Sequence, residues 1–196
     1  MGTSQKRGSA AAVAFGGVLS IALFVPFTIA HGPTSVDLER DVLGWDMHAW
    51  GFLMGTLPPL LIGVGLRQLR ERVAGGRQAA YRSLTVMCFA MFLFAAMNLA
   101  FRAIGPPLDL FLLAPASVVA ALTTSRRGRV RAVLGLLAAA YVVALALSLV
   151  PAEFYDLYDG YRVFGIVAYG GVGLLWATLG TLLLHDEREG QWVSAG

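Results

Sequence analysis

The stretch Leu43–Arg70, with the sequence LGWDMHAWGFLMGTLPPLLIGVGLRQLR, decides the fold. It begins with an acid, a histidine and two tryptophans, continues through an apolar run, and ends in arginines. A helix needs about 20 apolar residues to cross the ~30 Å hydrocarbon layer of a bilayer. Tryptophans at one end and arginines at the other match the two interfaces of an inner membrane. We therefore expect a membrane-spanning helix with polar groups at its outer mouth.

The composition of the whole chain also indicates a membrane protein. Of its 196 residues, 57% are hydrophobic and only 14% are charged, whereas a water-soluble domain of this size needs more charged surface. The net charge of +3 does not indicate a nucleic-acid partner, because the basic residues lie between apolar runs and not on one face. The single cysteine, Cys88, lies within an apolar run, which excludes disulfides and cysteine metal sites within the chain.

Six apolar segments follow one another, and we expect a single domain, 1–196, built as an all-α bundle of six transmembrane helices. The expected spans are 9–31, 47–66, 83–104, 107–124, 132–150 and 163–184. The first follows two basic residues, as a secretory signal would, but its length and Pro26 favour a retained span. The fourth is short and contains Pro115.

The basic residues alternate between the two sides of this bundle. All of the fifteen Lys and Arg except Arg40, Arg102 and Arg162 fall in the N-terminal tail, the segments 67–82 and 124–131, or the C-terminal tail. The positive-inside rule then places both termini in the cytoplasm, as an even number of spans requires. Most of the twelve acids fall on the opposite, outer side. We expect a multi-pass protein of the bacterial inner (plasma) membrane.

Small residues at four-residue spacing occur in the first, second and sixth segments. They are Gly16 and Ser20, Gly51 and Gly55, and the stripe Gly165, Tyr169, Gly173 and Ala177. Small residues let helices approach closely in a membrane. We interpret them as contacts within the bundle; the alternative is a face for a second copy or a membrane-protein partner. The pair Pro58-Pro59 frees backbone carbonyls and is expected to kink the second span.

The first candidate site is the run from Trp45 to Trp50. On a helix, Asp46 and His48 point apart, so a direct acid–histidine pair is not expected. An acid and an imidazole at the mouth of a span can still donate or accept protons. The alternatives are that the tryptophans are interfacial anchors and that Asp46 caps the helix.

The second candidate site is residues 151–162, PAEFYDLYDGYR, which fit a short interfacial helix. The spacing places carboxylates in one row (Glu153, Asp156, Asp159) and tyrosines in the next (Tyr155, Tyr158). Carboxylates at three-residue spacing repel each other, which favours a protonated carboxyl group able to act as a general acid. The alternatives are a divalent-cation site and a solvated anionic loop.

The third candidate site is Asn98 and Arg102, four residues apart near the outer end of the third span. Polar and charged side chains at this depth are costly without partners. If Arg102 faces the bundle, it could hold an anionic head group such as a diphosphate or a carboxylate. Alternatively it extends to the surface, where it could pair with Asp109 or Glu153.

Several chemistries are absent from the sequence. There is no HExxH, GxSxG or P-loop motif, and the three histidines, His31, His48 and His185, are too dispersed for a catalytic metal. We therefore expect no metal and no cofactor.

The remaining features indicate an aromatic-lined pocket with acids at its rim. Its residues are Asp46, Glu153 and Asp156, beside Trp45, Trp50, Phe154, Tyr155 and Tyr158. In size, number of spans and residue types, the chain resembles the small integral-membrane terpene cyclases of microbial biosynthetic pathways. The resemblance implies that an acid protonates an olefin or epoxide and that aromatic faces stabilise the carbocation.

The leading hypothesis is therefore an enzyme that acts on an isoprenoid or other lipid-like substrate by acid catalysis. Asp46, Glu153 and Asp156 would donate protons, and Asn98 and Arg102 would orient the polar end of the substrate. The other expected substrate-binding residues are Trp45, His48, Trp50, Tyr155, Tyr158, Asp159 and Tyr169. The alternative is a small transporter or a non-enzymatic accessory subunit of a membrane complex.

Overall fold

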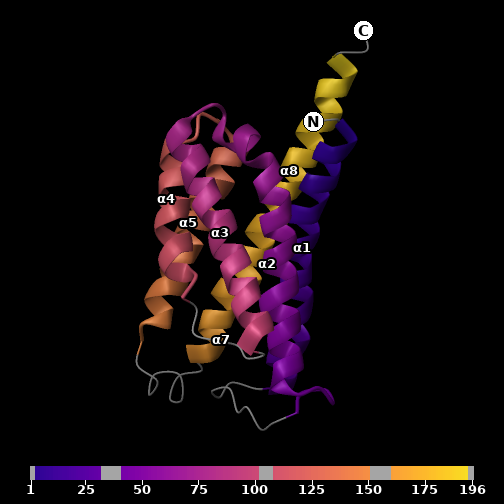
Figure 1. Ribbon diagram of the computed structural model, residues 1–196, viewed down its shortest axis with the longest axis vertical. Helices are drawn as coiled ribbons and strands as arrows, with labels where there is room; N and C mark the ends of the chain where they lie inside the picture. The colour runs from indigo at the N-terminus through magenta and orange to yellow at the C-terminus, as the bar shows by residue number, and fades with distance from the viewer. Residues whose placement is uncertain (1–2, 32–40, 102–107, 151–159, 194–196) are drawn as a thin grey trace.

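The computed structural model describes residues 3–31, 41–101, 108–150 and 160–193, and these residues form helices joined by short turns (Figure 1). The helices are α1 Thr3–His31, α2 Met47–Ala74, α3 Gln78–Phe101, α4 Leu110–Thr123, α5 Arg129–Ser148, and a final rod of α7 Gly160–Gly165, the π-helix η1 Ile166–Gly171 and α8 Val172–Val193. The described residues contain no strand, only an isolated bridge between Val42 and Trp45. The prediction of an all-α protein is confirmed.

The helices are arranged as a ring in the order of the chain. Each helix packs against the next, and α8 returns to pack against both α5 and α1. Figure 1 shows that the start of α1, the end of α8, and the α2–α3 and α4–α5 connections lie at one end of the bundle. We call this the arginine-rich end, because both connections carry arginines.

Five helices are long and apolar enough to cross a membrane. The segments are Arg7–Phe27, Phe52–Ala74, Gln78–Ala100, Arg129–Ser148 and Val163–His185. The remaining apolar helix, α4, has 14 residues and is about 21 Å long, against a hydrocarbon layer of ~30 Å. It begins at Leu110 and not at 107 as predicted. α2 continues to Ala74, beyond the predicted end of the span, because a helix need not end where its apolar run ends.

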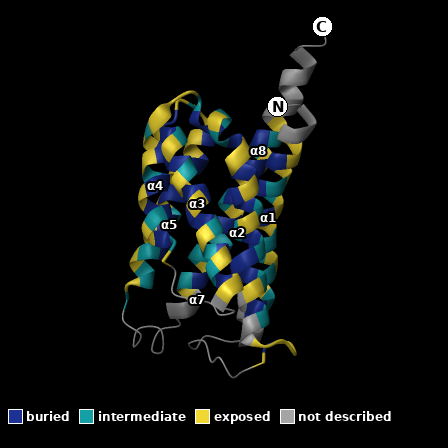
Figure 2. Ribbon diagram, viewed as in Figure 1, coloured by how far each residue is buried: buried dark blue, intermediate teal, exposed yellow. Residues whose placement is uncertain are grey.

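The outer surface of the bundle is apolar. In Figure 2, exposed positions run along the whole length of the helices. Large apolar side chains with more than half of their surface exposed include Phe15, Phe89, Leu122, Leu136 and Leu174. A water-soluble bundle would place polar side chains on such faces, whereas lipid tails solvate apolar ones. The surface and the five long apolar helices together indicate a membrane protein.

Glycines bring neighbouring helices into close contact. A Cβ atom at Gly17 would collide with the backbone of Gly173 and Ala177 on α8, and one at Gly55 would lie 2.5 Å from the Asn98 side chain on α3. Further glycines of the predicted stripes also contact a neighbouring helix, namely Gly16 and Gly165. At these positions the small residues make contacts within the bundle, as the sequence predicts. The surroundings of Gly51 lie outside the described residues.

Candidate functional site

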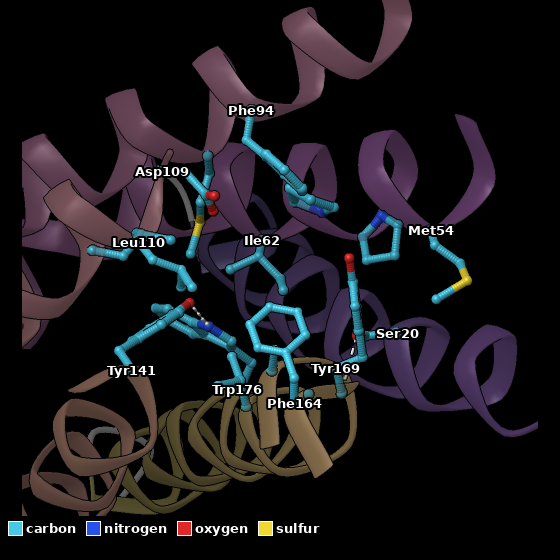
Figure 3. A pocket seen from close by; sticks show the side chains of 17 residues that line it. Ser20, Met54, Ile62, Phe94, Asp109, Leu110, Tyr141, Phe164, Tyr169 and Trp176 are labelled. Atoms are coloured by element: carbon cyan, nitrogen blue, oxygen red, sulfur yellow. Dashed lines mark hydrogen bonds between the residues drawn. The ribbon is translucent and has the colours of Figure 1, made fainter. Parts of the chain in front are cut away.

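A cavity of about 80 Å³ lies at the centre of the ring, between α1, α2, α3, α4, α5 and the final rod (Figure 3). Its walls are mainly aromatic and aliphatic. The aromatic residues that line it are Phe94, Tyr141, Phe164, Tyr169 and Trp176. Pro58 and Pro59 line it from α2, so the proline pair that the sequence singles out lies against this cavity.

One acid, Asp109, lines the cavity. Its backbone carbonyl accepts hydrogen bonds from the N–H groups of Leu112 and Leu113, at 3.0 and 2.8 Å, and so begins α4. Its side chain makes no capping hydrogen bond, although acids at this position of a helix commonly do. The carboxyl oxygen Oδ1 is buried and has no hydrogen-bond partner in the described part of the chain. Figure 3 shows the carboxyl group among the side chains that line the cavity.

A hydrogen-bonded aromatic pair forms another wall. Nε1 of Trp176 on α8 donates to the hydroxyl oxygen of Tyr141 on α5, at 2.9 Å (Figure 3). Both side chains are buried. Because the Tyr141 oxygen is the acceptor in this bond, its own hydroxyl proton remains available as a donor. Tyr141 and Asp109 therefore bring one donor and one carboxyl group with a buried oxygen to the same cavity.

The π-helix η1 presents Ala168 and Tyr169 to the cavity. Its wider turn changes the backbone hydrogen bonding, and Oγ of Ser20 on α1 donates to the Tyr169 carbonyl oxygen at 3.0 Å. The Tyr169 ring stacks on Phe24 at a centroid distance of 5.7 Å. Short π-helical segments are frequent at functional sites. Tyr169, expected from the sequence to bind substrate, therefore lies where a cavity ligand would meet it.

An aromatic cluster extends from the cavity towards the end opposite the arginines. Trp50 is buried, donates from Nε1 to the Val42 carbonyl oxygen at 2.9 Å, and lies 5.4 Å from Phe27 and 6.1 Å from Trp45 between ring centroids. Trp45 is half exposed. Trp50 is thus packed inside the bundle. Met54 belongs to both this cluster and the cavity wall, so it connects the two.

Asp46 has the capping interaction that the sequence leaves open as an alternative. Its Oδ1 accepts a hydrogen bond from the Ala49 backbone N–H at 2.6 Å, at the start of α2. The residue is exposed, and it is not among the residues that line the cavity. Its predicted role as a proton donor stays a prediction.

Asn98 is buried in the contact between α3 and α2. Only 2% of its surface is exposed, and Nδ2 donates to the Phe94 carbonyl oxygen one turn earlier at 2.9 Å. Oδ1 is buried and has no hydrogen-bond partner in the described part of the chain. The side chain packs against Gly55 and not against the cavity.

The other predicted site residues lie outside the part of the chain that the structure describes. They are Arg102, Glu153, Phe154, Tyr155, Asp156, Tyr158 and Asp159, together with the side chain of His48. Their predicted roles stay predictions.

Sequence reasoning did not select the residues that line most of the cavity. Tyr141 and Trp176 have a detectable signal, since a hydroxyl and an indole N–H in the middle of apolar spans each need a partner. From the sequence, Asp109 counts as one of the acids on the outer side, because the depth of its carboxyl group depends on where α4 begins. Phe94 and Phe164 carry no signal that separates them from lipid-facing phenylalanines.

No protein-family model, curated protein or solved structure matches the chain. Among the described residues there is also no group of three or more His, Cys, Asp or Glu side chains that could hold a metal ion. The cavity and its acid therefore carry the functional argument.

Proposed function

We propose that the chain is a six-span protein of the plasma membrane that binds an isoprenoid or similar lipid-like substrate in the central cavity and acts on it by acid catalysis. Asp109 is the proton donor. The observation that carries the proposal is the buried, unpartnered Oδ1 of Asp109 in a cavity with aromatic walls. Buried polar groups without a partner are rare and call for an explanation such as a catalytic role.

The depth of Asp109 supports this role. α4 ends at Thr123, close to the arginine-rich end, and begins at Leu110. The length of this helix therefore places Asp109 ~20 Å from the arginine-rich end. If the arginines mark one membrane surface, Asp109 lies within the ~30 Å hydrocarbon layer. Acids within the membrane are rare and usually functional. In this arrangement α4 belongs to the fourth of the six spans, and both termini are cytoplasmic.

The surroundings of the carboxyl group suit proton donation to an apolar substrate. A charge in apolar surroundings is costly, which favours the neutral carboxylic acid, the form that can give a proton. Protonation of an olefin or epoxide forms a carbocation. The faces of Tyr141, Phe164 and Trp176 stabilise it by cation–π attraction. Loss of a proton from another carbon, back to the Asp109 carboxylate, then gives an isomer of the substrate without any cofactor.

The size of the cavity restricts how a substrate enters. At about 80 Å³ it is smaller than the 300–1,000 Å³ typical of small-molecule sites. Met54 and Met91 line it, and methionine side chains adapt easily to a new shape. We infer that the reactive end of the substrate displaces these side chains while the remainder lies along the aromatic cluster around Trp50.

The test compares three acid-to-amide variants in lipid nanodiscs supplied with linear isoprenoid olefins and their terminal epoxides. We expect the wild-type protein to form a product of unchanged mass, detected by gas chromatography and mass spectrometry. Asp109→Asn should lower turnover by about 10²–10⁴-fold, the usual contribution of a general acid. Asp46→Asn, which alters only an exposed cap, is the matched control and should retain turnover.

The outcomes separate the competing proton donors. Loss of turnover in Asp46→Asn or Glu153→Gln, with full turnover in Asp109→Asn, would assign the acid to the outer residues predicted from the sequence. Full activity of all three folded variants would contradict acid catalysis. A transporter or an accessory subunit would also tolerate all three changes, but Gly16, Gly55 and Gly165 already contact neighbouring helices and not a partner protein.

A further inference from the structure

A second hollow, of about 610 Å³, opens at the arginine-rich end of the bundle. The first residues of α3 and α5 and the α4–α5 connection line it. Its polar lining includes Arg77, Gln78, Ser125, Arg127 and Arg131. It is separate from the central cavity and shares no lining residue with it.

Hydrogen bonds fix the two connections that form this hollow. Oγ1 of Thr124 donates to the Val73 carbonyl oxygen at 2.7 Å, and the N–H of Ser125 donates to the Ala74 carbonyl oxygen at 3.4 Å. Oγ of Ser125 also donates to the Gly75 carbonyl oxygen at 2.5 Å. The α4–α5 connection is therefore held against the end of α2, and Gly75 permits the turn there with a positive φ of 61°.

The hollow has the electrostatic character of an anion site. Arg77, Arg127 and Arg131 are exposed around it. Neither α3 nor α5 has an acid in its first turn, and Gly128, which precedes α5, offers no capping side chain. The first N–H groups of a helix lack intrahelical partners and carry partial positive charge, which attracts phosphate. No acidic residue in the described part of the chain lines the hollow.

We propose that this hollow binds the phosphate head group of an anionic phospholipid from the surrounding leaflet. Guanidinium groups bind phosphate oxygens through paired N–H donors, and basic hollows between spans at the cytoplasmic surface bind such head groups. Leu122 also lines the hollow with 69% of its surface exposed, so an apolar surface for an acyl chain lies beside the phosphate site. The inference does not depend on the chemistry of the central cavity.

The test measures lipid retention by native mass spectrometry, using full-length protein in nanodiscs of phosphatidylcholine with phosphatidylglycerol as a minor component. We expect one phosphatidylglycerol to stay bound to the wild-type protein. Changing Arg77, Arg127 and Arg131 together to Gln should reduce the bound fraction on the order of tenfold, since each arginine near the surface contributes to the attraction.

The matched control changes three exposed arginines near the same end that do not line the hollow, Arg67, Arg82 and Arg129, to Gln. It removes the same net charge and should retain the lipid. Equal loss in both triple variants would show a general attraction to basic residues and would overturn the proposal. Displacement of the lipid by an equal concentration of inorganic phosphate would also overturn it, because the hollow would then serve a soluble anion.

A further variant does not depend on removing any arginine. Ala79 is exposed in the first turn of α3 and lines the hollow. Ala79→Glu places a carboxylate where it favours the helix start but repels a phosphate, so we expect a folded protein without bound phosphatidylglycerol. Retention of the lipid by folded Ala79→Glu would contradict the proposed site.

Discussion

At the scale of single residues, the hydrogen bond between Trp176 and Tyr141 is the polar interaction that the cavity wall depends on. The indole N–H of Trp176 can only donate a hydrogen bond, and the Tyr141 oxygen is the acceptor that it uses. Removing the Tyr141 hydroxyl group leaves that donor buried without its partner. The carboxyl group of Asp109 differs, because its buried oxygen already lacks a partner.

We expect Tyr141→Phe to lower the free energy of unfolding by about 1 kcal/mol, because it leaves the Trp176 N–H unsatisfied. Reversible unfolding in mixed detergent micelles measures this change. The control is Tyr81→Phe, which removes a hydroxyl group but keeps the ring on which Arg70 packs at 4.7 Å. Equal stability of the two variants would show that the Tyr141–Trp176 bond contributes nothing.

At the scale of helices, the closure of the ring depends on the contact between α1 and α8. Gly17 lies against the α8 backbone, and Gly180 lies equally close to α1 around Ala14. Backbones this close gain van der Waals contact, which helices in a lipid environment need because no hydrophobic force drives them together.

Gly17→Ala should therefore lower the free energy of unfolding by about 1–3 kcal/mol, the usual cost of overpacking. The matched control is Gly135→Ala on α5, where a Cβ atom would meet nothing within 4 Å. This control should be neutral or gain up to about 1 kcal/mol from helix propensity. If Gly17→Ala is as stable as Gly135→Ala in mixed micelles, the close α1–α8 contact is wrong.

The helices were largely predictable from the sequence, whereas the cavity was not. Apolar run lengths locate α1, α2, α3, α5 and the final rod, because bilayer thickness sets the length of a span. The ends are less well predicted, since α2 and the final rod continue eight and nine residues past the predicted spans. No comparable sequence pattern predicts which face of each helix points inward. In a water-soluble bundle the polar face marks the outside, but here Phe89 faces outward while Phe94 lines the cavity. Tyr169, which lies on the predicted stripe of small residues, does line the cavity.

At the scale of the whole molecule, charged and polar side chains lie in three places: at the two ends of the bundle and around its central cavity. The start of α1, the end of α8 and the arginine-bearing α2–α3 and α4–α5 connections lie at one end, and the start of α2, which Asp46 caps, lies at the other. The Asp109 carboxyl group lines the cavity in the centre of the ring. This division has functional meaning only if the helices cross a bilayer, since lipid then surrounds the apolar outer surface and supplies a lipid-like substrate directly.

The most direct measurement is the side of the membrane on which each end of the ring lies. Single cysteines replace Leu43, Gly76 or Arg127 in a Cys88→Ala background, and intact cells are treated with a membrane-impermeant maleimide. We predict labelling of Leu43→Cys in intact cells, and labelling of Gly76→Cys and Arg127→Cys only after the membrane is opened. Labelling of Arg127→Cys from outside intact cells would contradict the six-span arrangement, and with it the membrane-embedded position of Asp109.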